Sequence, residues 1–333
     1  MSRASQIVRV VDSSEVAGAR RMAIQCAEGL RLSETEVGKA ALVTTELATN
    51  LVKHGNGGSI LFGSDHGQAS LSIIAIDKGR GIPNMNAAMR DGFSTAGSPG
   101  TGLGAVQRGA ITLDVYSLPD KGTVVLCRVG AEDKRPFYDK PRFILGGVCV
   151  AKPGEEIPGD DWTAASTRDS VTISVADGLG HGPVAATAAA AAVRIFSGGA
   201  ETPLERLLQD AHAELRPTRG AAVGIARIHA AQNRLDFTGV GNIAGTIATE
   251  DGTRRVVSLN GIVGHEMRKV QTFSYPWTAG SVLILQSDGT SANWNAGSYP
   301  GLMQHEPLLI AAVLYRDYCR GTDDATVVVA KAS

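Results

Sequence analysis

Four acidic segments in the second half of the chain could together bind metal ions. They are Asp160-Asp161, Asp177-Gly178, Asp288 within Ser-Asp-Gly, and Asp323-Asp324. Three of them directly precede or follow an apolar run that predicts a β-strand. Aspartates that converge at strand ends form a cluster of hard oxygen ligands, which prefers Mg²⁺ or Mn²⁺ to zinc. Any one segment alone is more typical of an ordinary turn, so the metal-site hypothesis depends on all four.

A second set of reactive side chains lies on one predicted helix in the first half of the chain. Glu46, Asn50 and Lys53 are four and three residues apart, so they share one helical face. Alone, these residues are more typical of a solvated polar stripe. Two glycine-rich segments follow, Asp77-Lys-Gly79-Arg-Gly81 and Gly100-Thr-Gly102-Leu-Gly104. Closely spaced glycines let backbone N–H groups approach phosphate oxygens, although neither segment matches the dinucleotide-binding or P-loop patterns.

Taken in order, these segments resemble the ATP-binding fold shared by gyrase, Hsp90, histidine kinases and MutL. Within that fold, Glu46-Leu-Ala-Thr-Asn50-Leu-Val-Lys53-His54-Gly55 is most similar to the anti-sigma-factor serine kinases and the switch kinases of stressosome pathways. Gly102-Leu-Gly104-Ala-Val-Gln-Arg108 and the later Lys121-Gly122-Thr123 also match. The resemblance covers nearly all of residues 8–130.

This resemblance implies roles in a kinase reaction that consumes ATP. Asn50 would hold a Mg²⁺ ion that bridges the phosphates, with Lys53 close by, and Asp77 would accept a hydrogen bond from the adenine amino group. Glu46 would take the proton from a substrate Ser or Thr hydroxyl. His54 is an alternative base and ranks below Glu46, because a histidine at a helix end is more commonly a dipole partner. The other implied ATP-binding residues are Gly79, Gly81, Gly100, Thr101, Gly102, Leu103, Gly104 and Thr123.

The acidic segments of the second half resemble the PP2C-type metal-dependent phosphatases, particularly the SpoIIE family. Asp177-Gly-Leu-Gly-His181-Gly182 followed by a helix of small residues is the most specific match, and the resemblance covers about residues 142–331. It implies that Asp160 and Asp177 bridge two Mn²⁺ or Mg²⁺ ions with help from the Gly178 carbonyl. Asp288 and Asp323 would bind the second ion.

Two questions about these residues stay open at the level of sequence. Spacing alone does not tell which residue of Asp160-Asp161 or of Asp323-Asp324 binds metal. His181 fits equally well as the acid that protonates the leaving group and as a cap of the next helix.

Periodicity and turn signals predict an α+β protein. In the first half, residues 13–30 and a helix from the capping box Ser33/Glu36 to His54 are expected to be helical, while residues 79–104 are too polar to form core. Expected strands in that half cover residues 59–63, 69–77, 113–117 and 122–129. In the second half, expected strands cover residues 143–151, 170–176, 221–228, 234–240, 254–259, 281–286 and 325–330. Expected helices there cover residues 185–196, 203–215 and 306–319.

The charged, proline-containing stretch Gly130–Arg142 predicts a linker. The expected domains are therefore residues 1–130, a linker at 131–141, and residues 142–333. With the two resemblances, the first domain is expected to be a Bergerat-type α/β sandwich that binds ATP. The second is expected to be a PP2C-like αββα sandwich.

Composition excludes several classes of protein. The chain has 333 residues with 32 Lys+Arg and 33 Asp+Glu, a net charge of −1, so it lacks the basic surface that nucleic-acid binding requires. With 43% hydrophobic and 20% charged residues, it is not a disordered chain. The four cysteines form no CxxC pair, which argues against zinc. No signal peptide and no apolar segment of about 20 residues are present, so we expect a soluble cytoplasmic protein without a membrane partner.

Together these features predict a bifunctional regulator of a stress or sigma-factor pathway. Its first domain would phosphorylate a Ser or Thr of a STAS-type anti-sigma-factor antagonist, and its second domain would remove that phosphate. One alternative is a phosphatase with a non-catalytic, ATP-sensing domain, and another is an anti-sigma-type binding protein. Kinase-like relatives commonly dimerise or join large assemblies, so a homo-oligomer or larger assembly is left open.

Overall fold

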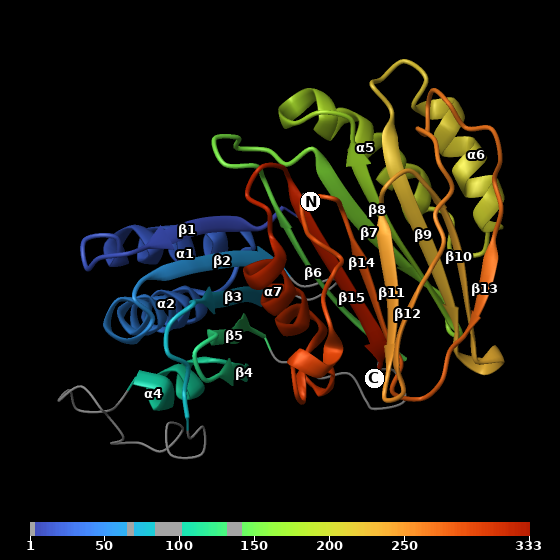
Figure 1. Cartoon of the computed structure of the whole chain (residues 1–333). Coiled ribbons are helices and arrows are strands. Elements are labelled where there is room, and N and C mark those ends of the chain that lie inside the picture. Colours follow the sequence, from blue (N-terminus) through green and yellow to red (C-terminus); the bar gives the residue numbers. More distant parts are fainter. Residues whose placement is uncertain (1–3, 65–69, 84–101, 132–141) are drawn as a thin grey trace. The chain divides into compact units, whose positions relative to one another are not determined.

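The computed structural model describes residues 4–64, 70–83, 102–131 and 142–333 (Figure 1). Gly100, Thr101 and all of the expected linker except Ala131 lie outside these ranges. The chain divides into two compact units, Ser5–Pro136 and Phe137–Ser333, with Met1–Ala4 assigned to the second. We call them the ATPase-like unit and the phosphatase-like unit, and each is described by itself.

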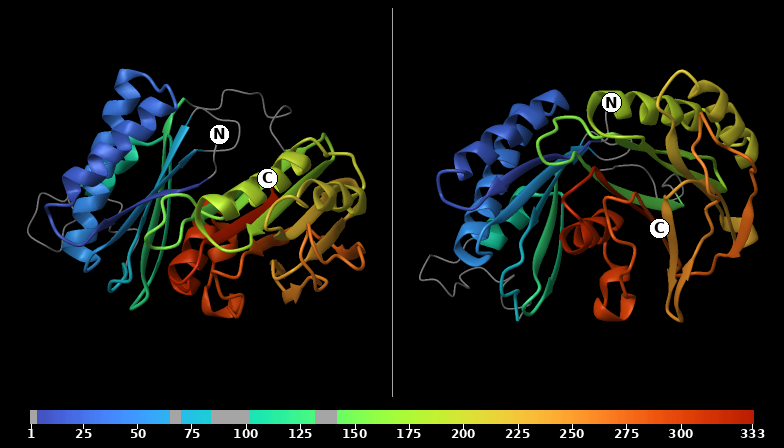
Figure 2. Two further views of the ribbon diagram at one scale, coloured as in Figure 1. Left: turned by 90° about the horizontal axis from the view of Figure 1, so that it is seen from above. Right: turned by 45° about the horizontal axis from the view of Figure 1, so that its top comes forward.

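The ATPase-like unit is a five-stranded antiparallel sheet with helices on one face (Figure 2, left). The strand order is β1-β2-β3-β5-β4. The strands are β1 (Gln6–Val10), β2 (Gly58–Ser64), β3 (Ser70–Ile76), β4 (Thr112–Leu118) and β5 (Gly122–Gly130). The helices are α1 (Val16–Gly29), α2 (Glu34–His54) and α4 (Gly102–Gly109), and their apolar sides share one core with the sheet.

Helix α2 carries the predicted kinase residues, and its start is fixed by local hydrogen bonds. The Ser33 hydroxyl accepts from the backbone N–H of Glu36, and the Glu36 carboxylate accepts from the backbone N–H of Ser33 at 2.8 Å. This is the predicted capping box. The buried side of the helix includes Val43, Leu47 and Leu51, whereas Glu46 and Asn50 are only half-buried.

The phosphatase-like unit contains two five-stranded antiparallel sheets packed face to face (Figure 1). The first sheet has the order β13-β10-β9-β8-β7 and the second has the order β12-β11-β14-β15-β6. The strands are β6 (Phe143–Val150), β7 (Asp160–Ser166), β8 (Ser170–Gly178), β9 (Ala221–His229), β10 (Arg234–Val240), β11 (Ala244–Thr249), β12 (Gly252–Arg255), β13 (Phe273–Pro276), β14 (Val282–Gln286) and β15 (Ala325–Ala332).

Helices cover the outer faces of both sheets. Helices α5 (Gly182–Ser197) and α6 (Leu204–Glu214) pack on the first sheet, and α7 (Pro307–Tyr318) packs on β6 and β15 of the second. The unit also contains the short 3₁₀ helices η2 (Ala230–Gln232), η3 (Ala296–Ser298) and η4 (Leu302–Gln304). The result is an αββα sandwich, and the predicted fold class is confirmed.

Side-chain alternation builds two cores in this unit. Along β8, Val171, Ile173 and Val175 point between the sheets, whereas Ala176 points toward α5 and α6. This is the period-2 pattern of a strand buried on both faces. The core between the sheets fixes how their strand ends meet, and those ends carry the aspartates.

The predicted strand over residues 254–259 is wrong beyond Arg255, where β12 ends. Beyond it, backbone hydrogen bonds from Val256 to Gly245 and from Leu259 to Gly239 alternate with side-chain contacts. The backbone N–H of Val257 donates to the Tyr275 hydroxyl at 2.9 Å, and the Ser258 hydroxyl donates to the Ile243 carbonyl at 2.9 Å, so no continuous ladder forms. Strands β1, β7, β11 and β13 and helix α4 are not among the predicted elements. In β7 the leading Asp160-Asp161 hides the strand, because aspartate is depleted in strands.

Among the described residues, no helix combines the length and apolar character needed to span a bilayer.

Candidate functional site

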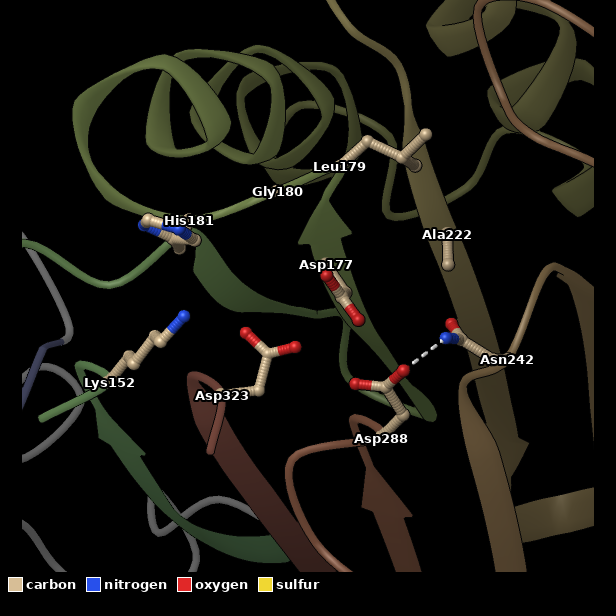
Figure 3. Close-up of a pocket in the computed structure, with 9 residues that line it drawn as sticks. All are labelled: Lys152, Asp177, Leu179, Gly180, His181, Ala222, Asn242, Asp288 and Asp323. Atoms are coloured by element: carbon tan, nitrogen blue, oxygen red, sulfur yellow. Dashed lines mark hydrogen bonds between the residues drawn. The ribbon is translucent and has the colours of Figure 1, made fainter. Parts of the chain in front are cut away.

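A cavity of about 200 Å³ opens where strand ends of the two sheets meet in the phosphatase-like unit (Figure 3). It is lined by Lys152, Asp177, Leu179, Gly180, His181, Ala222, Asn242, Asp288 and Asp323. Three of the four aspartates predicted to bind metal therefore lie on its wall. They come from β8, from the turn after β14 and from the turn before β15.

Asp160 and Asp177 are brought together by strand pairing. Asp160 begins β7 and lies directly opposite Asp177 near the end of β8. Gly178 follows, and helix α5 packs so closely on it that a Cβ atom there would collide with the Ala185 carbonyl oxygen. Only glycine fits this position, which explains the Asp-Gly pair of the sequence.

Asp160 is 4% exposed and lies behind the cavity wall. Its Oδ2 accepts a hydrogen bond from the Ser287 hydroxyl at 2.7 Å, and Ser287 Oγ in turn accepts from the backbone N–H of Thr326 at 2.9 Å. Asp160 belongs to the first sheet, whereas Ser287 and Thr326 belong to the second. This chain of hydrogen bonds therefore joins the two sheets beneath the cavity.

Asp288 and Asp323 come from the second sheet. Asp288 follows β14 and Asp323 precedes β15, and these strands are antiparallel neighbours. A Cβ atom at Gly289 would collide with the Asp324 carbonyl oxygen, so the two turns are held against each other. The side-chain amide of Asn242 donates to Asp288 Oδ2 at 2.7 Å and orients that carboxylate (Figure 3).

The structure distinguishes the members of both aspartate pairs. Asp323 lines the cavity, whereas the Asp324 carboxylate accepts from the backbone N–H groups of Lys152 and Gly159, both at 2.8 Å. Asp324 therefore holds the 152–159 loop. Asp161 follows Asp160 on β7 and points to the other face of the sheet, which favours Asp160 and Asp323 as the residues of the site.

Burial and mutual repulsion make this cluster electrostatically costly. Burial raises the pKa of Asp177, and the charges of Asp160 and Asp288 raise it further. Burial also raises the pKa of Asp160, although hydrogen bonds from Ser287 and Thr326 oppose the shift. Burial, followed by the charge of Asp323, raises the pKa of Asp288. The charge of Arg320 lowers the pKa of Asp288 but does not outweigh these effects, so the cluster carries more negative than positive charge.

The donor set fits a divalent cation of the Mg²⁺ or Mn²⁺ type. As the side chains stand, no three acidic, His or Cys groups among the described residues are placed to hold one ion. The available donors are nonetheless carboxylate oxygens gathered at one cavity, which these hard cations prefer. A bound cation would also remove the repulsion that raises the pKa values of the aspartates.

His181 lies at the rim of the cavity and pairs with a carboxylate. Its Nδ1 is 2.6 Å from Glu155 Oε1. His181 occupies the position before α5, but its side chain makes no capping hydrogen bond to that helix. Between the two roles that the sequence left open, the orientation therefore favours a side chain directed to the cavity.

Sequence reasoning missed Lys152 and Asn242, which also line the cavity. Each lies two residues beyond the end of a strand: Lys152 comes after β6 and Asn242 after β10. A polar residue at the end of an apolar strand was the available signal, but many turns share it.

The predicted adenine-binding residues of the ATPase-like unit are also brought together. Asp77 Oδ1 accepts from the backbone N–H of Gly79 at 2.8 Å and from that of Thr123 at 3.1 Å. The Thr123 hydroxyl is 2.9 Å from Ser117 Oγ. Gly81 has φ +71°, and a Cβ atom there would collide with the Leu118 carbonyl oxygen, so this turn requires glycine.

The end of α2, the helix that carries the predicted catalytic residues, lies next to this turn. Glu46 and Asn50 are half-buried and Lys53 is exposed. Near the end of the helix, a Cβ atom at Gly79 would lie 2.9 Å from the His54 carbonyl oxygen, so α2 and the Asp77 turn are in close contact. Burial, helped by the charge of Arg80, lowers the pKa of His54.

The second glycine segment is described from Gly102 onward. Gly102, Leu103 and Gly104 form the first turn of α4. This helix packs on α2, where a Cβ atom at Gly109 would lie 2.8 Å from Val43 Cγ2. Gly100 and Thr101 lie outside the described residues.

Comparisons with known families match both units. The profile "Stage II sporulation protein E (SpoIIE)" matches residues 167–333, half of the chain. The profile "Histidine kinase-like ATPase domain" matches residues 11–128. Both resemblances drawn from the sequence are confirmed.

Two curated proteins from Bacillus subtilis (strain 168), a kinase and a phosphatase, are each similar to part of this chain. The serine/threonine-protein kinase RsbT is 32% identical over 120 residues, which are 35% of this chain and 90% of RsbT. The phosphoserine phosphatase RsbX is 25% identical over 139 residues, which are 41% of this chain and 70% of RsbX.

Solved structures give similar matches. A chain from a structure of the bacterial stressosome is 27% identical with a TM-score of 0.53, covering 57% of this chain and 99% of that one. RsbX in complex with magnesium is 20% identical with a TM-score of 0.51, covering 67% of this chain and 100% of that one. At this identity the RsbX structure supports the fold alone.

Proposed function

We propose a function on one premise: the chain belongs to the SpoIIE family and joins its phosphatase domain to a histidine kinase-like ATPase domain. The protein is a bifunctional partner-switching regulator. Its residues 1–130 transfer phosphate from ATP to a Ser or Thr of a STAS-type anti-sigma-factor antagonist, and residues 142–333 hydrolyse that phosphate ester. Residues 131–141 link the two domains. Because the kinase reaction consumes ATP, we place the protein in the cytoplasm.

The observation that carries the phosphatase assignment is the convergence of Asp177, Asp288 and Asp323 on one cavity, with Asp160 buried behind it. These four carboxylates and the Gly178 carbonyl would hold two Mg²⁺ or Mn²⁺ ions. Such ions, when bound, would make a water molecule more acidic and offset the negative charge of the phosphoryl group.

Neighbouring residues of the chain orient the side chains of this site. Asn242 holds the Asp288 carboxylate through its 2.7 Å hydrogen bond. Ser287 fixes Asp160 and ties the sheets together. His181 is held by Glu155 at the rim of the cavity, where it would donate a proton to the departing Ser or Thr oxygen.

In the ATPase-like unit, each residue of α2 would have a separate role. Asn50 would hold the Mg²⁺ ion of Mg-ATP, with Lys53 near the phosphates. Glu46 lies one helical turn before Asn50, which suits a base that takes the proton of the attacking hydroxyl.

The turn and the glycine segments would bind the rest of the nucleotide. Asp77 would accept from the adenine amino group while its Oδ1 stays bonded to the N–H groups of Gly79 and Thr123. Gly81 and the segment Gly100, Thr101, Gly102, Leu103 and Gly104 would cover the phosphates.

The similarity to RsbT, a serine/threonine kinase, and to RsbX, a phosphoserine phosphatase, supports opposed activities on one chain. It favours catalysis in both domains over an ATP-sensing or purely sequestering first domain. The similarity to a stressosome component supports a protein substrate from the same kind of signalling assembly.

The two activities can be tested separately. With Mn²⁺ and a phosphorylated STAS protein, wild type and the control Asp161→Asn should release inorganic phosphate, and Asp177→Asn should not. With ATP, Mg²⁺ and unphosphorylated STAS protein, Asp177→Asn should incorporate phosphate, and the double variant with Glu46→Gln should not. Equal phosphate release by Asp177→Asn and wild type would refute the phosphatase assignment.

A further inference from the structure

The cavity of the phosphatase-like unit has an uneven charge distribution. Its nine lining residues include the carboxylates of Asp177, Asp288 and Asp323. Among those nine, Lys152 alone carries a permanent positive charge. A phosphate monoester dianion that enters this cavity therefore faces three carboxylates and one ammonium group.

Lys152 has a fixed backbone. It comes directly after Ala151, at the end of the buried strand β6, and its backbone N–H donates to Asp324 Oδ1 at 2.8 Å. Its carbonyl accepts from the backbone N–H of Glu155 at 2.9 Å, closing a turn. The position of the Lys152 Cα is therefore set by the same loop that carries Glu155, the partner of His181.

The ammonium group, in contrast, is available to a ligand. The Lys152 side chain extends into the cavity toward Asp323 and His181 (Figure 3). Within the part of the chain that the structure describes, it forms no ion pair with a carboxylate and its nitrogen donates no hydrogen bond to the protein. A half-buried lysine that points into an acidic cavity and stays unpaired is arranged to meet an anion from outside.

We propose that Lys152 binds the substrate: its ammonium group donates hydrogen bonds to the phosphoryl oxygens of the phosphoserine or phosphothreonine. This role rests on the proposed phosphatase function. Lysine is a suitable phosphate ligand because it is a compact charge with three donors on a flexible stem. It would hold the phosphoryl group from the side opposite Asp288, so that the divalent ions are not the only positive charges on the substrate.

Lys152 could instead serve only to offset the charge of the aspartates before any ligand binds. The two roles make opposite predictions. If Lys152 binds phosphate, its removal weakens phosphate binding while the ions are present. If Lys152 only offsets the charge of the aspartates, it stabilises the site only when the ions are absent. Its removal would then strengthen Mg²⁺ binding without weakening phosphate binding.

The test uses the full chain, saturating Mg²⁺ and inorganic phosphate as the probe, with binding measured by calorimetry. The variants are Lys152→Met, Lys152→Arg and the control Lys269→Met, which changes an exposed lysine of the same unit that does not line the cavity. In Lys152→Met the Kd for phosphate should rise about tenfold or more, and in Lys152→Arg it should stay within about threefold of wild type. Lys269→Met should bind phosphate as wild type does.

Two further measurements separate this role from others. The Kd for Mg²⁺, measured without phosphate, should not rise in Lys152→Met, because a positive charge has been removed. With a phosphorylated STAS protein, the KM of Lys152→Met should rise more than its kcat falls. Unchanged phosphate affinity in Lys152→Met, or a loss that parallels a loss of Mg²⁺ affinity, would overturn the inference. If wild type binds phosphate through Lys152 but hydrolyses no phosphoprotein, the proposed function fails and the binding role stands.

Discussion

The two candidate sites of this chain are built in opposite ways. The phosphatase site gathers buried or half-buried carboxylates from distant strand ends of two sheets, and burial raises the pKa of Asp160, Asp177 and Asp288. The ATP site places Glu46, Asn50 and Lys53 on a single helix, beside a turn in which Asp77 is already hydrogen-bonded by backbone N–H groups.

The difference shows what each site needs from its ligand. The aspartate cluster has too few positive or donor groups of its own, so a bound cation should stabilise the fold as well as the reaction. The Asp77 turn is satisfied by the protein's own backbone, so it should keep its shape without nucleotide. Removing ligands should therefore affect the two units differently.

The largest effect should come from Asp177→Asn, which removes the carboxylate central to the acidic cluster. Phosphate release from a phosphorylated STAS protein should fall about a thousandfold or more, because the ions contribute several kcal/mol to the transition state. ATP-dependent phosphorylation by the same variant should be unchanged. A parallel loss of both activities would break the proposed independence of the sites.

Glu46→Gln should give the next largest effect, confined to the other unit. Loss of a general base should lower the rate of phosphorylation about 100-fold or more, while the affinity for ATP stays near that of wild type. Thr45→Val, next to it on the same helix, is the matched control, because the Thr45 hydroxyl donates to the Ala41 carbonyl within the same helix. If Glu46→Gln removes partner binding instead of turnover, the sequestering function gains support.

A smaller effect should appear in the stability of the metal-free protein as pH changes. Folding raises the pKa of Asp177 from its ordinary 3.8, so above about pH 4 the folded state binds more protons than the unfolded state. The free energy of unfolding contributed by this group therefore falls as pH rises. The melting temperature measured with a chelator should fall as pH rises, by about 2–4 °C for each kcal/mol of unfolding free energy that is lost. Saturating Mg²⁺ should reverse this fall. Asp177→Asn should show a weaker pH dependence, and an equal dependence would contradict this explanation.

The smallest effect should come from Ser33→Ala, which removes the capping box of α2. The free energy of unfolding of the ATPase-like unit should fall by about 1 kcal/mol, with phosphate release unchanged. Ser14→Ala is a suitable comparison, because the Ser14 hydroxyl pairs only with exposed Asp12. Denaturant unfolding monitored by a probe in each unit would measure both effects.

Local patterns predicted the two long helices of the ATPase-like unit well, although they missed β1 and α4. The capping box at Ser33, the helix to His54 and the shared face of Glu46 and Asn50 depend on residues within one helix, so spacing alone was sufficient. The αββα sandwich and the four aspartates were expected from the resemblance to PP2C-type phosphatases, because spacing alone did not choose within Asp160-Asp161 or Asp323-Asp324.

Contacts between distant segments could not be predicted in the same way. The choice of Asp323 over Asp324 depends on bonds to Lys152 and Gly159, more than 160 residues earlier. Lys152 and Asn242 reach the cavity only because two sheets meet there. Strand β7 was missed because it begins with two aspartates, a residue type that is depleted in strands.

The most direct test of opposed activities on one substrate is intact-mass spectrometry of a STAS protein incubated with this chain, ATP and Mg²⁺. We predict that one phosphate accumulates and persists with Asp177→Asn, that little persists with wild type, and that none appears with the Glu46→Gln, Asp177→Asn double variant. Absence of phosphate with Asp177→Asn, while wild type still clears phosphorylated STAS protein, would contradict the kinase assignment and make the first domain a regulator.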